Sequence, residues 1–403
     1  MIETHVAPQA PTTVAIRPAS GAPKAVPTRS VDSGPVGCLR PFWNEQLNSR
    51  AGVKLGAGKW SSVWTAQLLP ESRPLFLLTA GDRILVQERT RWQLLDLRGE
   101  RIAYGAVGHS DCVLDPANGL FYASAKSGLV AARRLSDGGD AFSVFAQFGE
   151  MFRRTYIARR GERLIFAGVE RSIDPHDHVP PNRSMLESQT LGAPLALHAS
   201  GLVTNSETRG VLNFETLDLF AALGGRFAAV ATPDRIEIAD LDLRVQRVLT
   251  GSFKPLALSM DELDHLHLLA RSGDRTVYWQ ITAEGERTSA RELPSAPLDP
   301  PVPPMVGNDH RVHLALRDRV LTLDPRGEPD RTYRPPGAIV GAAVTADDRL
   351  VMVSGNQVLA VDATGQATTL YTTQERLVTP PSFTASGRLL VASAGALYVL
   401  ESR

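Results

Sequence analysis

Four side chains that can bind a metal ion lie within five consecutive residues of the stretch SIDPHDHVPPNRS: Asp174, His176, Asp177 and His178. Carboxylates and imidazoles at this spacing can bind Zn²⁺ or a similar ion when a further ligand converges on them. The neighbouring prolines are typical of an exposed loop, where such side chains are simply solvated. Two histidines two residues apart also meet no closed tetrahedral pattern. We therefore expect a solvated loop rather than a metal site, and keep these four residues as the candidate ligands.

Two other histidines, His267 and His313, are candidates for a pH-sensitive pair. His265 and His267 alternate in DHLHLL, so both point to one face of a predicted strand. Aligned copies of a repeat described below place His267 and His313 in a slot that is apolar elsewhere, at Leu85, Phe121, Ile165, Val351 and Leu390. We expect both histidines to be packed between adjacent sheets. As neighbours across one interface they would titrate together.

No arrangement in the sequence predicts a catalytic residue. His109, Asp111 and Cys112 are close in GHSDCV, but a cysteine nucleophile needs a lowered pKa and a positioned base. The stretch GAGKWS fails as a phosphate-binding loop, because Val53 replaces its first glycine and Trp60 its Ser or Thr. There is no G-x-S-x-G, H-E-x-x-H or paired C-x-x-C motif. We expect no catalytic residue and no cofactor, and favour a protein that is not an enzyme.

A repeat positions these residues. Each copy has a Gly- or Asp-rich turn, an alternating apolar strand, a second turn and a second strand, as in ADDRLVMVSGNQVLAVDATGQ. The leading strands begin at Ile84, Leu120, Leu164, Phe227, Leu266, Val312, Leu350 and Leu389, 36 to 63 residues apart. Repeats of about 40 to 50 residues with four short strands are typical of β-propeller blades. We predict an all-β propeller of eight four-stranded blades, with seven blades as the alternative.

The boundaries of the propeller follow from two irregularities. The 63-residue gap from Leu164 to Phe227 holds either an insertion or a degenerate repeat at 193–215. We favour an inserted loop near 170–193, because 25 residues from Leu202 to Phe227 are too few for a blade. The last repeat has three strands, so we expect KWSSVWTAQLL, near 60–69, to pair with the C-terminal blade and close the ring. The propeller then spans 59–403.

The residues before the propeller have a different composition. Residues 1–36 are rich in Pro, Ala, Thr and Ser and are predicted to be a disordered tail, or a peptide that orders on a partner. Residues 37–58 are a transitional segment. Its apolar cluster, Pro41, Phe42 and Trp43, is a candidate interaction site that could cap the ring or anchor a neighbouring subunit.

Composition excludes several classes of partner. The chain has 43 acidic and 43 basic residues, so no broad field favours nucleic acid. It has no 18-residue apolar run for a membrane span and no signal peptide, and its two cysteines show no metal or redox spacing. We expect a cytoplasmic protein, and its scarce Lys with abundant Ala and Pro suggests a bacterial one.

The pieces TPPSFTASGRLLVASAGALYVL and QVLAVDATGQATTLY resemble the quinoprotein-like (PQQ-like) repeat. The resemblance covers about 60–403 and implies a β-propeller of that superfamily. Family members dock successive blades through a Trp, whereas this chain has Tyr104, Tyr333 and Tyr371 at those places. The quinone-binding enzymes of the superfamily need an adjacent Cys pair and calcium-binding carboxylates, which we do not find.

Three functions remain open. The first is a non-catalytic scaffold in a bacterial multi-protein complex, of the kind that includes a MoxR-type ATPase or a von Willebrand A-domain protein. The second is a metal-dependent hydrolase similar to lactonase propellers, with Asn308, Asp309, Asn356 and Asp234 at comparable turns. The third is a small-molecule or carbohydrate sensor, which 6% aromatic residues disfavour. We favour the scaffold, with other proteins as the partners.

Overall fold

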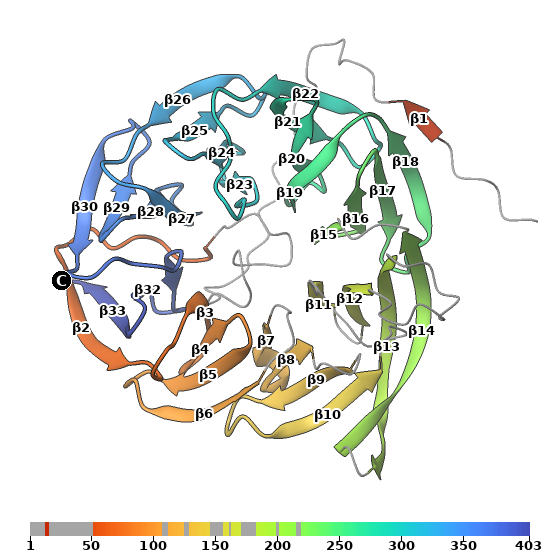
Figure 1. The fold of residues 1–403 in the computed structure, drawn as a ribbon, viewed down its shortest axis with the longest axis horizontal. Coiled ribbons are helices and arrows are strands. Elements are labelled where there is room, and N and C mark those ends of the chain that lie inside the picture. Colours follow the sequence, from red (N-terminus) through yellow and green to blue (C-terminus); the bar gives the residue numbers. More distant parts are fainter. Residues whose placement is uncertain are drawn as a thin grey trace, which may run out of the picture.

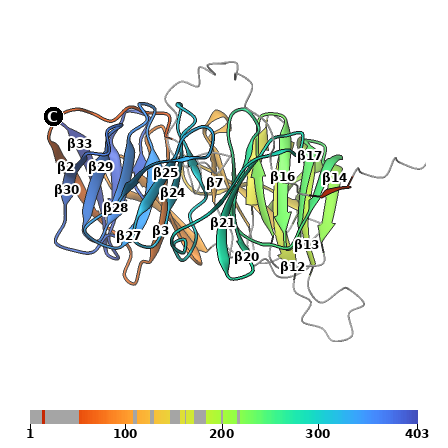
Figure 2. The same ribbon diagram turned by 90° about the horizontal axis from the view of Figure 1, so that it is seen from above.

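The computed structural model describes residues 13–15, 51–106, 112–124, 129–145, 156–160, 163–170, 183–198, 201–214 and 219–403. In these ranges every regular element is a β-strand, apart from one turn of 3-10 helix, η1 (Pro116–Asn118). The strands form a ring of upright sheets (Figure 1), and seen from its edge they run between two faces (Figure 2). The same residues contain no helix long and apolar enough to cross a membrane. The predicted all-β propeller is confirmed.

The strands fall into consecutive groups of four, numbered here as blades. Blade 1 is β3 (Pro74–Ala80), β4 (Arg83–Glu88), β5 (Arg91–Asp96) and β6 (Arg101–Ala106). Blade 2 is β7 (Val113–Asp115), β8 (Leu120–Ser124), β9 (Leu129–Arg134) and β10 (Asp140–Phe145). Blade 3 is β11 (Tyr156–Arg160), β12 (Arg163–Glu170), β13 (Arg183–His198) and β14 (Gly201–Phe214). Blade 4 is β15 (Phe220–Leu223), β16 (Phe227–Thr232), β17 (Arg235–Asp240) and β18 (Val245–Thr250).

The second half of the ring repeats this order. Blade 5 is β19 (Lys254–Met260), β20 (Leu266–Ser272), β21 (Arg275–Ile281) and β22 (Arg287–Glu292). Blade 6 is β23 (Met305–Val306), β24 (Val312–Ala315), β25 (Val320–Leu323) and β26 (Pro329–Tyr333). Blade 7 is β27 (Ile339–Val344), β28 (Leu350–Ser354), β29 (Gln357–Val361) and β30 (Ala367–Thr372). Blade 8 is β31 (Ser382–Phe383), β32 (Leu389–Ala392), β33 (Ala396–Ser402) and β2 (Trp60–Gln67).

Hydrogen bonding groups these eight four-stranded units into seven sheets. Blades 2 and 3 form one eight-stranded sheet, because β10 and β14 pair in parallel at Ser143 and Val203. Blade 4 gains a fifth strand, β1 (Thr13–Ala15). Among the described strands, the repeats thus give eight antiparallel units, while the number of continuous sheets is seven, as in the alternative.

The ring is closed as the sequence predicts. Strand β2 pairs antiparallel with β33, from Trp60 opposite Ser402 to Gln67 opposite Ala396. Strand β2 is therefore the outermost strand of the C-terminal blade (Figure 1). The predicted closure near residues 60–69 is confirmed.

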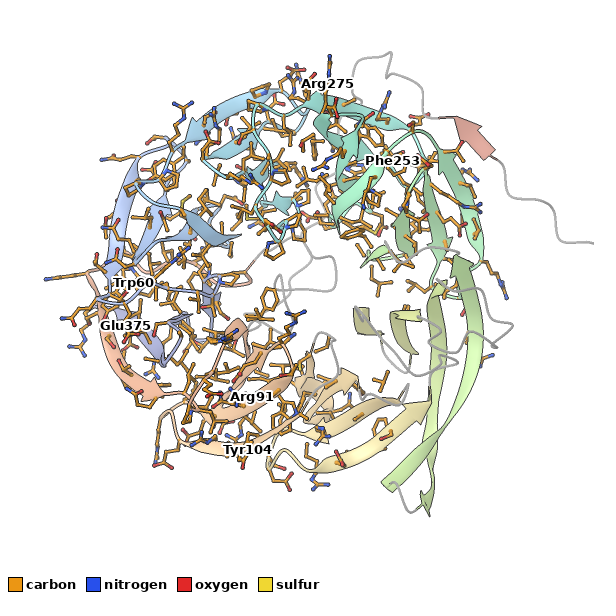
Figure 3. The ribbon with its side chains drawn as sticks, in the orientation of Figure 1. Trp60, Arg91, Tyr104, Phe253, Arg275 and Glu375 are labelled. Carbon is orange, nitrogen blue, oxygen red and sulfur yellow. The ribbon has the colours of Figure 1, made fainter. Side chains whose placement is uncertain are left out.

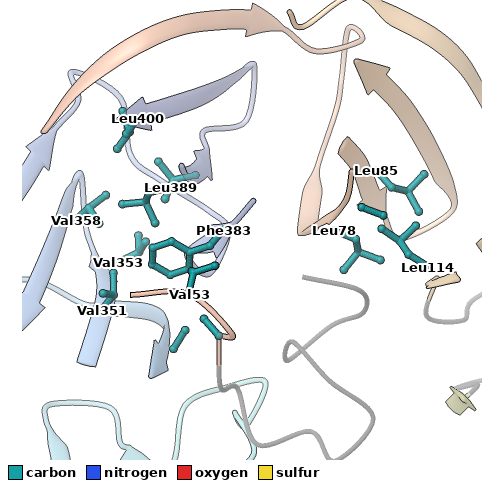
Figure 4. Close-up of a cluster of buried hydrophobic side chains, with 14 of the residues drawn as sticks. Val53, Leu78, Leu85, Leu114, Val351, Val353, Val358, Phe383, Leu389 and Leu400 are labelled. Carbon is teal, nitrogen blue, oxygen red and sulfur yellow. The ribbon is translucent and has the colours of Figure 1, made fainter. Parts of the chain in front are cut away.

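The residues before β2 make a second attachment, to blade 7. The Ala51 amide donates to the Val344 carbonyl at 2.7 Å, and the Ala346 amide donates to the Val53 carbonyl at 2.8 Å. Val53 is buried in the same core cluster as Phe383 (Figure 4). The described part of the transitional segment thus lies on the last two blades, while Pro41, Phe42 and Trp43 lie outside the described residues.

The predicted loop insertion near 170–193 is wrong for its second half. Residues 183–193 belong to β13, and 193–214 complete a hairpin with β14. These strands have 16 and 14 residues, whereas the other strands have two to eight. In the described residues of this gap, the extra length therefore goes into long strands. Gly192 and Pro194, which suggest a loop in the sequence, are accommodated where the register of the hairpin shifts.

Inner strands whose side chains are described, such as β28, are buried on both faces, because their sheet is packed between two others. In β28, Leu350 and Met352 pack with blade 6, while Val351 and Val353 pack with blade 8. Both faces are apolar for this reason, and a strand such as LVMVS is apolar along most of its length. Side chains fill the spaces between the sheets (Figure 3).

The tyrosines that replace the docking tryptophans behave differently from one another. Tyr371 of blade 7 has its ring centroid 6.4 Å from that of Tyr398 in blade 8, so it joins those blades. Tyr104 on the outer strand β6 is 66% exposed (Figure 3). The docking role is therefore present at one of these two places.

Candidate functional site

Several residues singled out in the sequence lie outside the described part of the chain. They are Asp174, His176, Asp177 and His178, together with His109 and Asp111. Cys112 is described and fully buried, and its amide donates to Oε1 of Gln87 at 2.9 Å. The described residues contain no group of three or more His, Cys, Asp or Glu placed to hold a metal.

His267 and His313 are both buried between sheets, but the structure does not bring them together. Nδ1 of His267 lies 2.8 Å from the Tyr278 hydroxyl, and Nε2 lies 3.3 Å from Oδ2 of Asp261. Nδ1 of His313 lies 3.0 Å from Oγ1 of Thr322. The two rings occupy successive interfaces, since each points toward the next blade around the ring.

Asp261 is the centre of a buried polar network. Its Oδ1 accepts the amides of Leu263 and His265, and its Oδ2 accepts Nδ1 of His265 and Nε2 of His267. Because a carboxylate only accepts, both ring nitrogens carry protons. The other ring nitrogen of His267, Nδ1, lies 2.8 Å from the Tyr278 hydroxyl. The network thus runs from Tyr278 through His267 to Asp261.

The charges in this network are mutually supporting. Burial favours the neutral acid, but the bonds from His265 and His267 hold the pKa of Asp261 well below its usual range. Burial acts against protonated His265, but the Asp261 carboxylate raises the pKa of His265. Burial, and then the Asp261 charge, raise the pKa of Tyr278 well above normal. Tyr278 is fully buried and Asp261 nearly so, which keeps a substrate from this Asp–His–Tyr chain and makes it a structural clamp.

Asp261 begins one of four turns that join the first and second strands of a blade with the same backbone, at 261–265, 307–311, 345–349 and 384–388. In each, the first amide donates to the fifth carbonyl, and the fourth amide donates to the first carbonyl. The fourth residue therefore has a left-handed backbone, with φ of 62° at Asp264, 58° at His310, 57° at Asp348 and 86° at Gly387. Glycine suits this conformation, and Asp and His tolerate it better than most residues.

The three non-glycine residues at this position reach back to the preceding blade. Oδ2 of Asp264 accepts Nε of Arg226 at 2.9 Å, and Oδ1 accepts the Arg226 amide at 3.2 Å. Nδ1 of His310 lies 3.9 Å from Oε1 of Glu262. Oδ1 of Asp348 accepts the amide of Asn308. Asp264 and Asp348 thus tie their own blades to the preceding ones by hydrogen bonds, whereas Nδ1 of His310 has no hydrogen-bond partner among the described residues.

Further hydrogen bonds extend these contacts from blade 6 to segment 51–55. Nδ2 of Asn308 donates to the Ala346 carbonyl at 2.7 Å, and Oδ1 of Asp347 accepts the Leu55 amide at 3.0 Å. A Cβ on Gly224 would lie 2.2 Å from Oδ1 of Asp264, so this approach requires glycine. We call the set of turns 224–226, 261–265, 307–311 and 345–349, with segment 51–55, the turn belt. It links blades 4 to 7 along one face.

A polar cleft lies beside the belt, between blades 6 and 7. Its lining includes Asp309, Arg311, His313, Arg331 and Asp348. Arg311 donates to Asp309 at 2.6 Å and to Asp330 at 3.0 Å, so these charges largely cancel. Burial lowers the pKa of His313 to about 4. Among the described residues its Nε2 has no hydrogen-bond partner. The cleft offers one uncharged ring nitrogen to a water or another small polar molecule.

The turn belt was not predicted from the sequence, although a signal is present. Aligned copies read DELDH, GNDHR, TADDR and TASGR, so Asp264, His310 and Asp348 align with Gly387. A position shared by Gly, Asp and His indicates a left-handed backbone. Which group each side chain contacts depends on how the blades pack.

Comparisons with known proteins agree with the geometry. No family model matches the chain, and no curated protein matches it. BamB from Moraxella catarrhalis is 13% identical with a TM-score of 0.57, over 85% of this chain and 98% of that chain. Sqt1 from Saccharomyces cerevisiae is 10% identical with a TM-score of 0.57, over 88% and 99%. The quinohemoprotein alcohol dehydrogenase from Comamonas testosteroni is 10% identical with a TM-score of 0.60, over 91% and 81%. At these identities the likeness shows the fold alone: the chain is a β-propeller.

Proposed function

We propose that this propeller is a non-catalytic scaffold that holds partner proteins on the face formed by the turn belt. The observation that supports the proposal is the set of side-chain contacts between successive turns: hydrogen bonds join blade 4 to blade 5 and blade 6 to blade 7 and to Leu55, and His310 lies 3.9 Å from Glu262 between blades 5 and 6. Binding residues are commonly placed on turns that a rigid support holds. We propose further that the chain works in the bacterial cytoplasm within a multi-protein complex, of the MoxR-type ATPase or von Willebrand A-domain kind.

The composition of the belt indicates the chemistry of a partner. Its half-buried side chains carry both signs, with Glu262, Asp309 and Asp347 beside Arg311 and Arg349. Several of these charges are already paired within the belt. A partner would thus bring a mixed polar surface that adds to fixed ion pairs, and such surfaces favour specificity over raw affinity.

The test is capture of partners by the full chain and by two charge-reversal variants. Arg349→Glu changes the belt, where this side chain is 37% exposed and pairs with Asp347 at 3.3 Å. Arg317→Glu is the control, an exposed residue in the turn between β24 and β25 at the opposite end of the strands. We expect a stoichiometric protein partner that the control retains and Arg349→Glu loses.

Two results would contradict the proposal, and the first would favour the metal-dependent hydrolase. Stoichiometric Ca²⁺ or Zn²⁺ in the purified protein, lost with Asp174→Ala and His176→Ala and accompanied by ester or lactone hydrolysis, would overturn the scaffold proposal. Equal loss of the partner in both charge-reversal variants would also contradict the belt as the binding face.

A further inference from the structure

The outer edge of blade 4 carries a strand that does not belong to the repeat. Strand β1 (Thr13–Ala15) runs parallel to β18, with Thr13 opposite Val248, Val14 opposite Leu249 and Ala15 opposite Thr250. All described pairings inside the four-stranded units are antiparallel, so β1 is an addition to a complete blade. Figure 1 shows it on the outside of the ring, beside β18. Residues 13–15 lie in the stretch predicted to be a disordered tail, but in the structure they form the fifth strand of the blade 4 sheet.

The sequence of β18 leaves this edge open to a further strand. Open sheet edges are commonly protected by charges or proline. The outer strand β22 has three charged residues, and β26 begins with Pro329 followed by Asp330 and Arg331. Strand β18, VQRVLT, has one charge and is otherwise apolar, β-branched or amide-bearing. Strand β30, ATTLYT, is similarly unprotected, but no described strand is added to it, so lack of protection alone does not place β1.

The segment that fills the edge suits it. The residues around β1 read TTVAI, which are β-branched apart from one alanine, and are flanked by Pro11 and Pro18. β-branched residues favour extended strands, and the prolines limit the length of the pairing. The three residues of β1 lie opposite three of the six residues of β18, and no described strand pairs with 245–247 on that side.

A pairing this short depends on its tether. Residues 16–50, 35 in number, separate β1 from the described chain at Ala51. A tether of this kind supplies an effective concentration on the order of millimolar, which keeps a weak contact occupied while leaving it exchangeable. A segment that matched all six residues of β18 would make about twice as many backbone bonds and would displace β1.

We propose that the outer edge of β18 is a strand-acceptor site for extended segments of β-branched and small residues, and that Thr13–Ala15 of the same chain is its resident, exchangeable occupant. The segment covers an edge that would otherwise invite edge-to-edge association. A partner that docks by strand addition would have to displace it, and this last point alone rests on the scaffold function proposed above.

The experiment uses the full chain with Cys38→Ser and one added cysteine pair. Ala15→Cys with Thr250→Cys joins directly opposite residues, and Thr250 is exposed. Ala15→Cys with Thr368→Cys is the matched control, on the exposed and equally unprotected strand β30. A short thiol-bridging reagent is added to dilute protein, and intact mass with non-reducing electrophoresis measures the product. We expect a monomeric cross-link that forms at least about tenfold faster in the Thr250 pair than in the control.

Two further measurements complete the test. Val14→Pro removes a backbone donor from β1 and should speed amide exchange in β18, with no change in β30. A synthetic peptide, APTTVAIR, at millimolar concentration should slow the Thr250 cross-link. A dimeric cross-link would identify a second copy as the occupant and overturn the assignment to the same chain. Equal rates for the two pairs would overturn the acceptor site itself. Both results come from purified protein, so they leave the partner-capture test of the scaffold function standing by itself.

Discussion

Replacing Asp264 by glycine sets two opposite contributions of the turn belt against each other. The backbone at Asp264 has φ of 62°, a conformation that disfavours L-residues by about 1 kcal/mol relative to glycine. Gly387 occupies the same turn position in blade 8, so this backbone accepts glycine. If the side chain of Asp264 contributed nothing, the variant would be more stable by about that amount.

The hydrogen bonds of the Asp264 side chain stabilise the fold by more than its left-handed backbone destabilises it. Asp264 is 3% exposed and accepts both the amide and Nε of Arg226. The Arg226 side chain is 69% exposed, so the ion pair itself is worth about 0–1 kcal/mol. The hydrogen bond from the Arg226 backbone amide to the charged Asp264 carboxylate is worth about 1.5–3 kcal/mol. We therefore expect Asp264→Gly to lower the free energy of unfolding by about 1–2 kcal/mol.

Urea unfolding of the full chain, followed by tryptophan fluorescence, measures this difference. Two further variants separate its sources. Asp264→Asn keeps one acceptor and the tolerance for a left-handed backbone, and should lose less than glycine does. Arg226→Ala removes the exposed ion pair and the contact of the guanidinium with the Phe227 ring but keeps the backbone amide bond to Asp264, and should lower stability by less than Asp264→Gly does. If Asp264→Gly were as stable as the natural chain or more so, with an unchanged urea dependence, the side-chain links of the turn belt would carry no energy and our reasoning would be refuted.

Three other perturbations have defined outcomes. His313 has a folded pKa of about 4, below its unfolded value near 6.5, so the unfolded chain binds this proton first and stability falls from pH 6.5 toward pH 4. His313→Leu should reduce that fall, as the difference in urea midpoint between pH 7 and pH 5 will show. His265 has a raised pKa, so its contribution is present below pH 6.5 and is lost as the pH rises through the folded pKa. His265→Gln should weaken the loss of stability between pH 6 and pH 8, and an unchanged slope would contradict the bond to Asp261. Gly105→Ala places a Cβ 2.8 Å from the Trp92 ring and should cost about 1–3 kcal/mol in urea unfolding, whereas Gly395→Ala meets no atom within 4 Å and should be neutral.

The architecture could be predicted because burial on two faces leaves a regular mark on the sequence. Strands such as β28 are apolar along most of their length, and Gly or Asp turns separate them at nearly constant spacing. The missing fourth strand of blade 8 then identified residues 60–69 as the closing segment, which β2 confirms. These features depend on the local pattern of apolar residues and on the number of strands in each repeat.

Features that depend on the third dimension were missed or misread. Alternation does not tell how far a strand continues, so the long β13–β14 hairpin was interpreted in part as a loop. Equivalent positions of successive blades point the same way around the ring, and His267 and His313 therefore cannot meet across one interface. The partners of Asp264 and Asp348 lie about 40 residues away, in the preceding blade. The strand β1 is too short, at three residues, to give a periodic signal.

Native-state amide exchange tests most directly whether the ring is one closed body. Strands β2 and β33 are more than 300 residues apart in the sequence, but β2 pairs with β33 from Trp60 to Gln67. We expect the amide of Ala66, and that of Leu68, which donates to the Gly395 carbonyl at 2.9 Å, to open with the same free energy as those of Leu397 and Val399, within about 1 kcal/mol, because these amides bond across the β2–β33 pairing and exchange only when it opens. Exchange of the β2 amides with an opening free energy near zero, while β33 stayed protected, would contradict the closure on which the turn belt and its function depend.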